Sequence, residues 1–443
     1  MARVTLQIFD LVSKRLSIAR SIGNIKLEKG LDIEDRSVEA RLRGLVLDEC
    51  ERLGIDRRFG SHLLSLLIKE SVRMQTQDLP RRIDTFQRAK YLESQGMKVI
   101  HLELEGPNLL TPQSIEDLCN ALKSFHSSYT EAGGLYELRE AIAHYINESF
   151  KVDISARNVI VTLNRRYTIF LATYSHVTIG DEIILFQPSY LAYQPWSEVM
   201  GVRVIKIPTY LKDGWSPNLD HLNEAINDST SMILIHNPNN PTGKVIDSNT
   251  LKAIVDLAHD NDLPILSDES YSHYTFTDFQ SILQFSNCKS MVVKSFPIDL
   301  MGLELCYVIS DQKTIERMIT LQDSILAYMP EFIQRIALKM IDLKPYTMKD
   351  LEIILRRRDA AVKALLRLPF DFRRPDGGIF IFAKARINDF DGERFTNDLL
   401  EKKGVAVMPG VAFGNYRDHI RISLCQPENI ILEGIERMGE LIS

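Results

Sequence analysis

Hydrophobic residues recur at helical spacing over roughly 4–28, 36–53 and 57–78, with breaks at Gly30 and at Gly54. Apolar positions three and four residues apart share one face of a helix, so each run predicts an amphipathic helix. All 17 prolines lie at or after Pro80, and proline interrupts helices. The first 79 residues therefore predict a module of three helices.

From about residue 97 short β-branched runs alternate with amphipathic stretches; the runs are NVIVT, DEIILF, SMILIH, LPILSD and SMVVKS. This alternation is typical of a mostly parallel sheet covered on both faces. After about residue 340, a charged helical stretch followed by RPDGGIFIFAKA, GVAVMP and HIRISLCQ predicts a smaller α+β domain.

The fold class is thus α/β. We expect a helical module at 1–79, a linker and the first part of the small domain at 80–124, a large domain at 125–335, and the rest of the small domain at 336–443.

Composition predicts a globular protein and excludes several partners. Of the 443 residues, 45% are hydrophobic and 25% are charged, which suffices for two or more domain cores. The net charge of -6 supplies no basic field for a nucleic-acid backbone. No stretch reaches about 18 uninterrupted apolar residues, so we expect no membrane span, and charges within the first apolar run argue against a signal peptide. We therefore expect a cytoplasmic location. The five scattered cysteines predict reduced thiols and no metal site.

Polar residues of the helical module fall in pairs whose separations are close to whole numbers of helical turns. The pairs are Arg15 with Lys26, Asp35 with Glu39, and Ser71 with Gln75. Each pair alone is consistent with a solvated helix face. Together they predict an inward-facing polar cluster, because burying such groups is costly without a ligand or partners.

This segment resembles the all-helical chorismate mutases. In that family a first helix carries an arginine and ends in a lysine, as in SKRLSIARSIGNIK. A turn then leads to an Asp and an Arg-Glu pair, as in DRSVE, and the last helix carries Ser-x-x-x-Gln, as in SVRMQ. Two features depart from the family pattern. Val38 replaces the arginine of the Arg-Glu pair, and the first helix begins too late for a further arginine about four turns earlier.

The resemblance implies conversion of chorismate to prephenate. This rearrangement of a dicarboxylate needs cations on the carboxylates and a donor at the ether oxygen, but no nucleophile. Arg15 and Lys26 would hold the carboxylates, and Lys26 and Gln75 would donate to the ether oxygen. Asp35, Glu39 and Ser71 would complete the catalytic site.

Two motifs follow predicted strands of the large domain. HNPNNPTGKV comes after the strand SMILI and leaves Asn240 at the strand end. In LPILSDESYSHYTF, Asp268 stands at a strand tip and Tyr271 lies one turn beyond. Ligands of α/β sheets bind at the carboxyl ends of the strands, where an acid can hold a protonated ring nitrogen.

From about residue 97 to residue 441 the chain resembles the class I/II aminotransferases, which are dimeric fold-type-I pyridoxal phosphate enzymes. The resemblance implies that Asp268 pairs with the pyridine nitrogen, and that Asn240 and Tyr271 bond the ring hydroxyl. It also implies that Ser295 lies at the cofactor, Tyr190 stacks on the ring, Tyr129 reaches the partner subunit's phosphate, and Arg421 clamps the substrate carboxylate. Taken singly, Asp268 is also consistent with a residue that caps a helix, and Tyr190 and Tyr129 are consistent with core aromatics. Arg421 alone is consistent with a surface ion pair.

The same resemblance predicts missing groups. The family's Ser-x-Ser-Lys, whose lysine forms the Schiff base, is Ser295-Phe296-Pro297-Ile298 here, and its phosphate-binding arginine is Glu304. Lys294 lies about 13 Å along a strand from the required position, which is too far for its side chain. The loop after NVIVT carries Arg165 and Arg166 where small residues are needed, so these either form a new anion site or fill the vacated phosphate pocket. These losses argue against pyridoxal phosphate binding and predict negligible transaminase activity.

Three functions are compatible with the sequence. In the first, the helical module is a chorismate mutase, and the large domain is a non-catalytic dimer scaffold or an effector-binding regulator. In the second, the large domain is an active aminotransferase with a relocated lysine, acting on prephenate, an aromatic keto acid or an aspartate-type substrate. In the third, both sites have decayed and the protein is a binding or structural protein. We expect a homodimer with a small-molecule ligand, either chorismate or an amino or keto acid.

Overall fold

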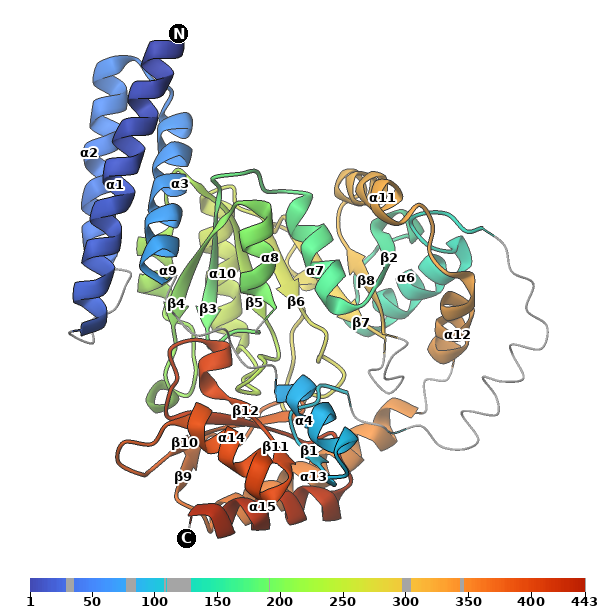
Figure 1. Ribbon diagram of the computed structural model, residues 1–443. Coiled ribbons are helices and arrows are strands. Elements are labelled where there is room, and N and C mark those ends of the chain that lie inside the picture. The colour runs from blue at the N-terminus through green and yellow to red at the C-terminus, as the bar shows by residue number, and fades with distance from the viewer. Residues whose placement is uncertain are drawn as a thin grey trace.

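The computed structural model describes residues 1–28, 36–76, 85–106, 109, 129–190, 192–296, 304–342 and 346–442. Within these ranges the molecule has three parts: an N-terminal helical module, a large α/β domain and a smaller α+β domain (Figure 1). The fold class predicted from the hydrophobic pattern is confirmed.

The helical module consists of α1 (Ala2–Glu28), α2 (Arg36–Leu53) and α3 (Arg57–Thr76), which confirms the three predicted helices. Helix α3 packs against both α1 and α2. A Cβ atom built on Gly23 of α1 would lie 2.8 Å from Cγ of Gln75 on α3. Glycine at position 23 therefore allows the close approach of these two helices.

Seven strands form the central sheet of the large domain: β2 (Val159–Leu163), β3 (Glu182–Gln187), β4 (Arg203–Pro208), β5 (Thr230–His236), β6 (Ile265–Asp268), β7 (Ser290–Ser295) and β8 (Leu305–Ile309). Their order is β2-β8-β7-β6-β5-β3-β4. Strand β8 runs antiparallel to both neighbours, and the other pairs are parallel. The predicted mixed, mostly parallel sheet is thus confirmed.

Helices bury both faces of this sheet, as the continuous β-branched runs require. One face packs on α6 (Tyr136–Phe150), α9 (Leu219–Ala225), α10 (Ser248–Asp260) and α12 (Glu331–Asp342). The other face packs on α7 (Arg165–Tyr174), α8 (Tyr193–Met200) and α11 (Gln312–Leu326). Asn164 and Asp247 cap the amino ends of α7 and α10, because their side chains accept hydrogen bonds from backbone N–H groups of the first turn.

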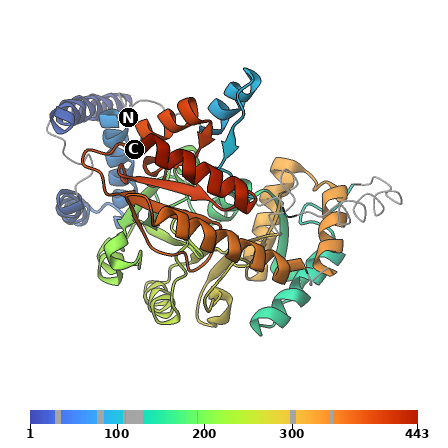
Figure 2. The ribbon, with the colours of Figure 1, turned by 90° about the horizontal axis from the view of Figure 1, so that it is seen from below.

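The small domain combines segments from both ends of the aminotransferase-like region. Its antiparallel sheet has the order β12 (Met408–Pro409), β13 (His419–Ser423), β10 (Phe380–Ala385) and β9 (Phe370–Phe372), and β1 (Ile100–His101) pairs in parallel with β11 (Val405–Ala406). Its helices are α4 (Thr85–Ser94), α13 (Tyr346–Leu365), α14 (Gly392–Lys403) and α15 (Glu428–Ile442). Figure 2 shows α13 and α15 side by side. Short 3-10 turns span Ala156–Asn158, Leu211–Asp213, Ile282–Gln284 and Gly410–Phe413.

Two absences hold for the described part of the chain. None of its helices combines the length and apolar character needed to cross a membrane. Its His, Cys, Asp and Glu side chains form no group of three that is suited to a metal ion.

Candidate functional site

Buried polar side chains gather where the carboxyl ends of β5 and β6 meet the small domain. Asp268 ends β6, His236 ends β5, and Asn240 follows in the next loop. Arg421 lies on β13 of the small domain, and its Nη1 donates to Oδ1 of Asn240 at 2.9 Å. These four side chains lie in or next to separate sequence motifs, but the fold brings them into one buried cluster. We call this cluster the central pocket.

Arg165, the first residue of α7, lies in the middle of the central pocket. Its guanidinium carbon is 4.0 Å from the ring centre of Tyr190 and 4.9 Å from that of Tyr271. The side chain is only 3% exposed, and its Nη2 donates to Glu105 at 2.6 Å. Two aromatic faces and an ion pair thus hold the guanidinium in place.

Glu105, in the loop after β1, joins two arginines across the pocket. One carboxylate oxygen accepts from Arg165, and the other accepts from Nη1 of Arg421 at 2.9 Å. Burial alone would raise the pKa of Glu105, but the two guanidinium groups lower it below its usual value. Glu105 is therefore a charged carboxylate that Arg421 already binds.

Asp268 finds its partners within the protein. The hydroxyl of Tyr193 donates to it at 2.9 Å, and Ser270 donates through its hydroxyl at 2.6 Å and its backbone N–H at 3.1 Å. Burial alone would raise the pKa of Asp268, but His236, Arg165 and the bonds from Ser270 lower it. His236 lies 3.6 Å from the carboxylate, yet burial lowers the pKa of this histidine to about 4. The ring is therefore neutral at pH 7, and the contact is not an ion pair.

Lowering the pH from 7 to 5 is expected to destabilise the fold in part through His236. Because its folded pKa of about 4 lies below the unfolded value of about 6.5, the unfolded chain binds more protons between these values. The contribution to stability is complete above pH 6.5 or so and decreases as the pH falls toward 4. We expect about 2 kcal/mol less unfolding free energy at pH 5 from this group, measured by urea denaturation. His236→Asn should flatten the pH dependence, whereas the exposed control His221→Asn should not; equal slopes for wild type and His236→Asn would contradict this assignment.

The remaining predicted cofactor residues have varied surroundings. The ring of Tyr271 stacks on His236 with centres 5.8 Å apart, and its hydroxyl has no partner among the described residues. The hydroxyl of Ser295 lies 3.3 Å from Sγ of Cys306. Tyr129 is 83% exposed and therefore contributes nothing to the central pocket of its own chain.

Lys294 is held away from the central pocket. Its Nζ lies 2.9 Å from Glu269 and 3.0 Å from the hydroxyl of Ser272, and 4.5 Å from the ring centre of Phe150 on α6. The pocket residue Asp268 instead contacts Tyr193 of α8, on the other face of the sheet. Pro297 and Ile298 lie outside the described residues, so the loss of the Schiff-base lysine stays a prediction.

The helical module brings part of its predicted site together. Nε2 of Gln75 donates to the carbonyl of Ser71 at 3.2 Å, and the Ser71 hydroxyl donates to the carbonyl of Leu67 at 2.7 Å. Oε1 of Gln75 and Nε of Arg15 are buried without partners among the described residues. Such unpaired buried atoms are uncommon and are compatible with a polar ligand.

Of the other predicted mutase residues, Lys26 and Glu39 lie within the described part of the chain. Lys26 follows Gly23, the contact point of Gln75, by about one helical turn. Glu39 pairs with Arg203 at the start of β4, in the large domain. Asp35 lies outside the described residues.

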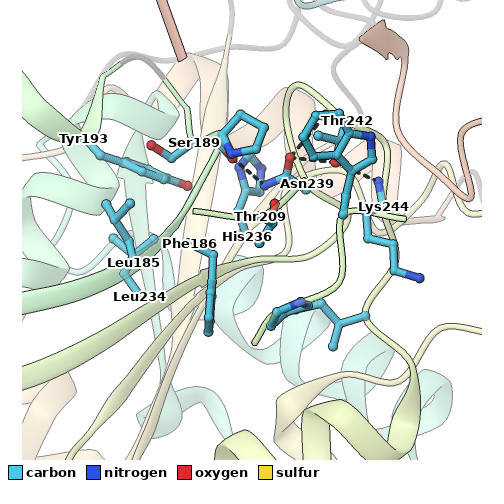
Figure 3. Close-up of a pocket in the computed structure, with 14 residues that line it drawn as sticks. Leu185, Phe186, Ser189, Tyr193, Thr209, Leu234, His236, Asn239, Thr242 and Lys244 are labelled. Atoms are coloured by element: carbon cyan, nitrogen blue, oxygen red, sulfur yellow. Dashed lines mark hydrogen bonds between the residues drawn. The ribbon is translucent and has the colours of Figure 1, made fainter. Parts of the chain in front are cut away.

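A small cavity adjoins the central pocket (Figure 3). Figure 3 shows Tyr193 on one side of it and Asn239, hydrogen-bonded to Thr242, on the other. Its free volume of about 30 Å³ holds one or two water molecules. A second cavity of about 20 Å³ lies beside Tyr190 and Phe413.

Comparison with known protein families shows to which family this chain belongs. The model of the aminotransferase class I and II family matches residues 111–437, which is most of the chain. The chain belongs to this family. The chorismate mutase type II model matches residues 1–76, so this aminotransferase-family protein carries an N-terminal chorismate mutase type II domain.

The similarity of individual proteins and solved structures to this chain supports the family assignment. The aspartate aminotransferase of Pyrococcus horikoshii is 30% identical over 370 residues, which cover 81% of this chain and 93% of the relative. A probable aspartate/prephenate aminotransferase of Aquifex aeolicus is 28% identical, with 80% and 94% covered. The crystal structure of the Thermotoga maritima aspartate aminotransferase matches with a TM-score of 0.77 and 29% identity, covering 83% of this chain and 98% of that chain. These similarities confirm the fold-type-I architecture.

Relatives in this family imply pyridoxal phosphate as the cofactor, but the described side chains do not fit it as they stand. The faces of Tyr190 and Tyr271 hold the guanidinium of Arg165, not an open space for a ring. Asp268 is hydrogen-bonded by Tyr193 and Ser270. At the start of α7 the N–H of Tyr167 is capped by the side chain of Asn164, so it is not free for a phosphate. Arg165 thus occupies the space between the two tyrosines. The two alternatives for Arg165 and Arg166, a new anion site or filling of the vacated phosphate pocket, stay predictions.

Sequence reasoning missed three residues of the pocket. Glu105 follows the alternating stretch HLEL, and nothing in its neighbourhood marks it as a partner of arginine. His236 precedes the NPNNPTG loop, and Tyr193 follows Tyr190 by three residues, so proximity to known motifs was the only available signal. The roles assigned to Tyr190, Asn240, Asp268 and Arg421 stay predictions, because each side chain contacts protein groups here.

Proposed function

We propose that this chain is an aromatic amino-acid pathway protein in which the N-terminal domain converts chorismate to prephenate. We further propose that the aminotransferase domain is not catalytic. The observation that carries the second statement is the guanidinium of Arg165 between Tyr190 and Tyr271. The first statement is supported by the match over residues 1–76 and by the buried, unpaired polar atoms of Arg15 and Gln75.

The rearrangement depends on positioning and electrostatics, and it requires no cofactor. Arg15 and Lys26 are the cations proposed to bind the two carboxylates, and the amide of Gln75 is a neutral donor for the ether oxygen. Donors arranged before the reaction stabilise the developing charge without reorganisation. Close packing of α1 on α3 at Gly23 supplies this arrangement.

The test is the consumption of chorismate by the purified full-length protein. We expect a rate on the order of 10⁶-fold above that in buffer, at the lower end of enzymatic accelerations. Formation of prephenate identifies the reaction. A rate equal to that in buffer would exclude the mutase proposal.

A second candidate is aminotransfer to prephenate or an aspartate-type keto acid, favoured by the similarity to the Aquifex aeolicus relative. It requires Arg165 to leave the central pocket and a lysine to reach the cofactor. Transfer of an amino group from glutamate or aspartate to prephenate, dependent on added pyridoxal phosphate, would establish this function and exclude a non-catalytic domain.

An exposed apolar stripe on α1 supports the expected homodimer. It consists of Val4, Ile8, Leu11, Ile18, Ile22 and Ile25, each at least 43% exposed. The intervals of three, four and seven residues place these side chains along one face, which suits packing against a helix of a second copy. A single chain leaves this face in water.

Substitution of this stripe is expected to weaken the dimer. The double variant Ile8→Glu/Ile18→Glu places charges in an apolar contact and should raise the dimer dissociation constant at least about tenfold, measured by sedimentation equilibrium. The control Gln7→Glu/Asn24→Asp changes exposed polar residues of the same helix and should leave it unchanged. A stripe variant that dimerises like the wild type would show that α1 is not the contact.

A further inference from the structure

The mutase and aminotransferase domains are joined by ion pairs at the amino ends of β3 and β4. Arg203 begins β4, is buried, and reaches two acids: Nη1 lies 3.2 Å from Glu182, and Nη2 contacts Glu39 of α2. Arg43, one turn beyond Glu39, donates to Glu182 at 2.5 Å. Two arginines and two glutamates from both domains thus form one network, which we call the interdomain network.

Glu182 anchors the interdomain network. It is fully buried and also accepts hydrogen bonds from Ser65 of α3 at 2.8 Å and from Asn227 at 2.9 Å. Burial alone would raise the pKa of Glu182, but Arg43 and Arg203 lower it. Because the two arginines outnumber this one acid, Glu39 supplies the second negative charge of the network. A guanidinium with its planar set of donors can serve both carboxylates at once.

Glu39 lies level with the predicted mutase residues of α3. A Cβ built on Gly60 of α3 would clash with Sγ of Cys50 on α2, so these positions face each other in the hairpin of the two antiparallel helices. Eleven residues before Cys50 is Glu39, and eleven residues after Gly60 is Ser71. The guanidinium of Arg203, which contacts Glu39, therefore lies at the part of the helical module that contains Ser71.

We propose that Arg203 is a positioning residue for the mutase reaction, which fixes the Glu39 carboxylate from the neighbouring domain. This inference rests on the proposed mutase function. In the pattern of the mutase family an arginine precedes this glutamate, and Val38 stands there in this chain. Arg203 places a guanidinium on the same acid from outside the module. The aminotransferase domain thereby becomes a structural part of the mutase site.

Variants of Arg203 in the full-length protein test the proposal through the kcat/KM for chorismate. Arg203→Ala should lower kcat/KM at least about tenfold, mainly through kcat, because Glu39 loses its fixed position. Arg203→Lys should recover part of this loss, since an ammonium keeps the charge but lacks the planar fork. Arg203→Lys also keeps the comparison decisive if Arg203→Ala does not fold.

A matched control is available at the same interface. Arg57 of α3 lies 3.4 Å from Asp228, and the two side chains are 58% and 48% exposed. Arg57→Ala removes an interdomain pair without touching Glu39, so kcat/KM should stay within about twofold of wild type. Equal kcat/KM values for Arg203→Ala and Arg57→Ala would overturn the proposal.

A double-mutant cycle separates positioning from general stabilisation. If Arg203 acts through Glu39, Arg203→Ala should change kcat/KM less than about twofold in a Glu39→Gln background. The same loss in both backgrounds would assign Arg203 a structural role only. Absence of chorismate turnover in the wild-type protein would instead refute the mutase function itself. Wild-type turnover with an unaffected Arg203→Ala variant would refute the positioning role alone.

Discussion

Wild-type protein incubated with pyridoxal phosphate and then desalted is expected to stay colourless, whereas the Arg165→Ser/Glu105→Gly variant should bind the cofactor at least about 100-fold more tightly. The wild type must first break the 2.6 Å ion pair between Arg165 and Glu105 and remove the guanidinium from two aromatic faces. The variant removes both members of this ion pair, and Arg421, which also loses Glu105, keeps its hydrogen bonds to Asn240 and to the backbone carbonyl of Glu103. The faces of Tyr190 and Tyr271 are then free for a flat ring.

The measurement is the absorbance of protein-bound cofactor, supported by quenching of protein fluorescence during titration. Arg157→Ser, an exposed arginine just before β2, is the control and should behave as the wild type. Borohydride reduction followed by peptide mapping shows whether a lysine is labelled. A coloured wild-type protein with a labelled lysine would contradict both the filled pocket and the predicted loss of the Schiff-base lysine.

Arg15→Ala is expected to lower kcat/KM for chorismate by a factor of about 10² to 10³, the usual effect of removing one charged or hydrogen-bonding group that stabilises a transition state. Nε of Arg15 is buried without a partner among the described residues, so its free hydrogen-bonding capacity is available to a carboxylate. Loss of a fixed cation near a dicarboxylate should affect catalysis far more than folding.

Arg20→Ala is the matched control for this prediction, because Arg20 lies on the same helix with an exposed side chain. We expect its kcat/KM to stay within about twofold of wild type and the thermal unfolding temperatures of both variants to differ little. Equal losses in the two variants would mean that Arg15 supports the helix rather than the reaction.

The filled central pocket and the interdomain network together suggest why an aminotransferase domain accompanies the mutase. In the central pocket, Arg165 and Arg421 both pair with Glu105, a carboxylate of the protein itself. At the sheet edge, Glu182 and Arg203 reach the helical module. These contacts support the proposal that the domain has a structural role.

Much of the architecture followed from local pattern. Helical spacing of apolar residues predicted α1, α2 and α3 to within a few residues, and β-branched runs marked five strands of the central sheet. Asn240 and Asp268 were found because Asn240 lies in the loop after a predicted strand and Asp268 at a strand tip, and parallel strands end at a common edge. In contrast, the catalytic role of Asp35 and the loss of the Schiff-base lysine at Ile298 stay predictions, because both positions lie outside the described residues.

The sequence by itself determined which elements form, because helix and strand periodicity are encoded over a few neighbouring residues. Only the tertiary structure decided which charges meet. Arg165 pairs with Glu105, Arg421 with Glu105, and Arg203 with Glu39, across 60, 316 and 164 residues of chain. Such pairs depend on how whole elements pack, since a buried charge takes the partner that the fold brings within reach.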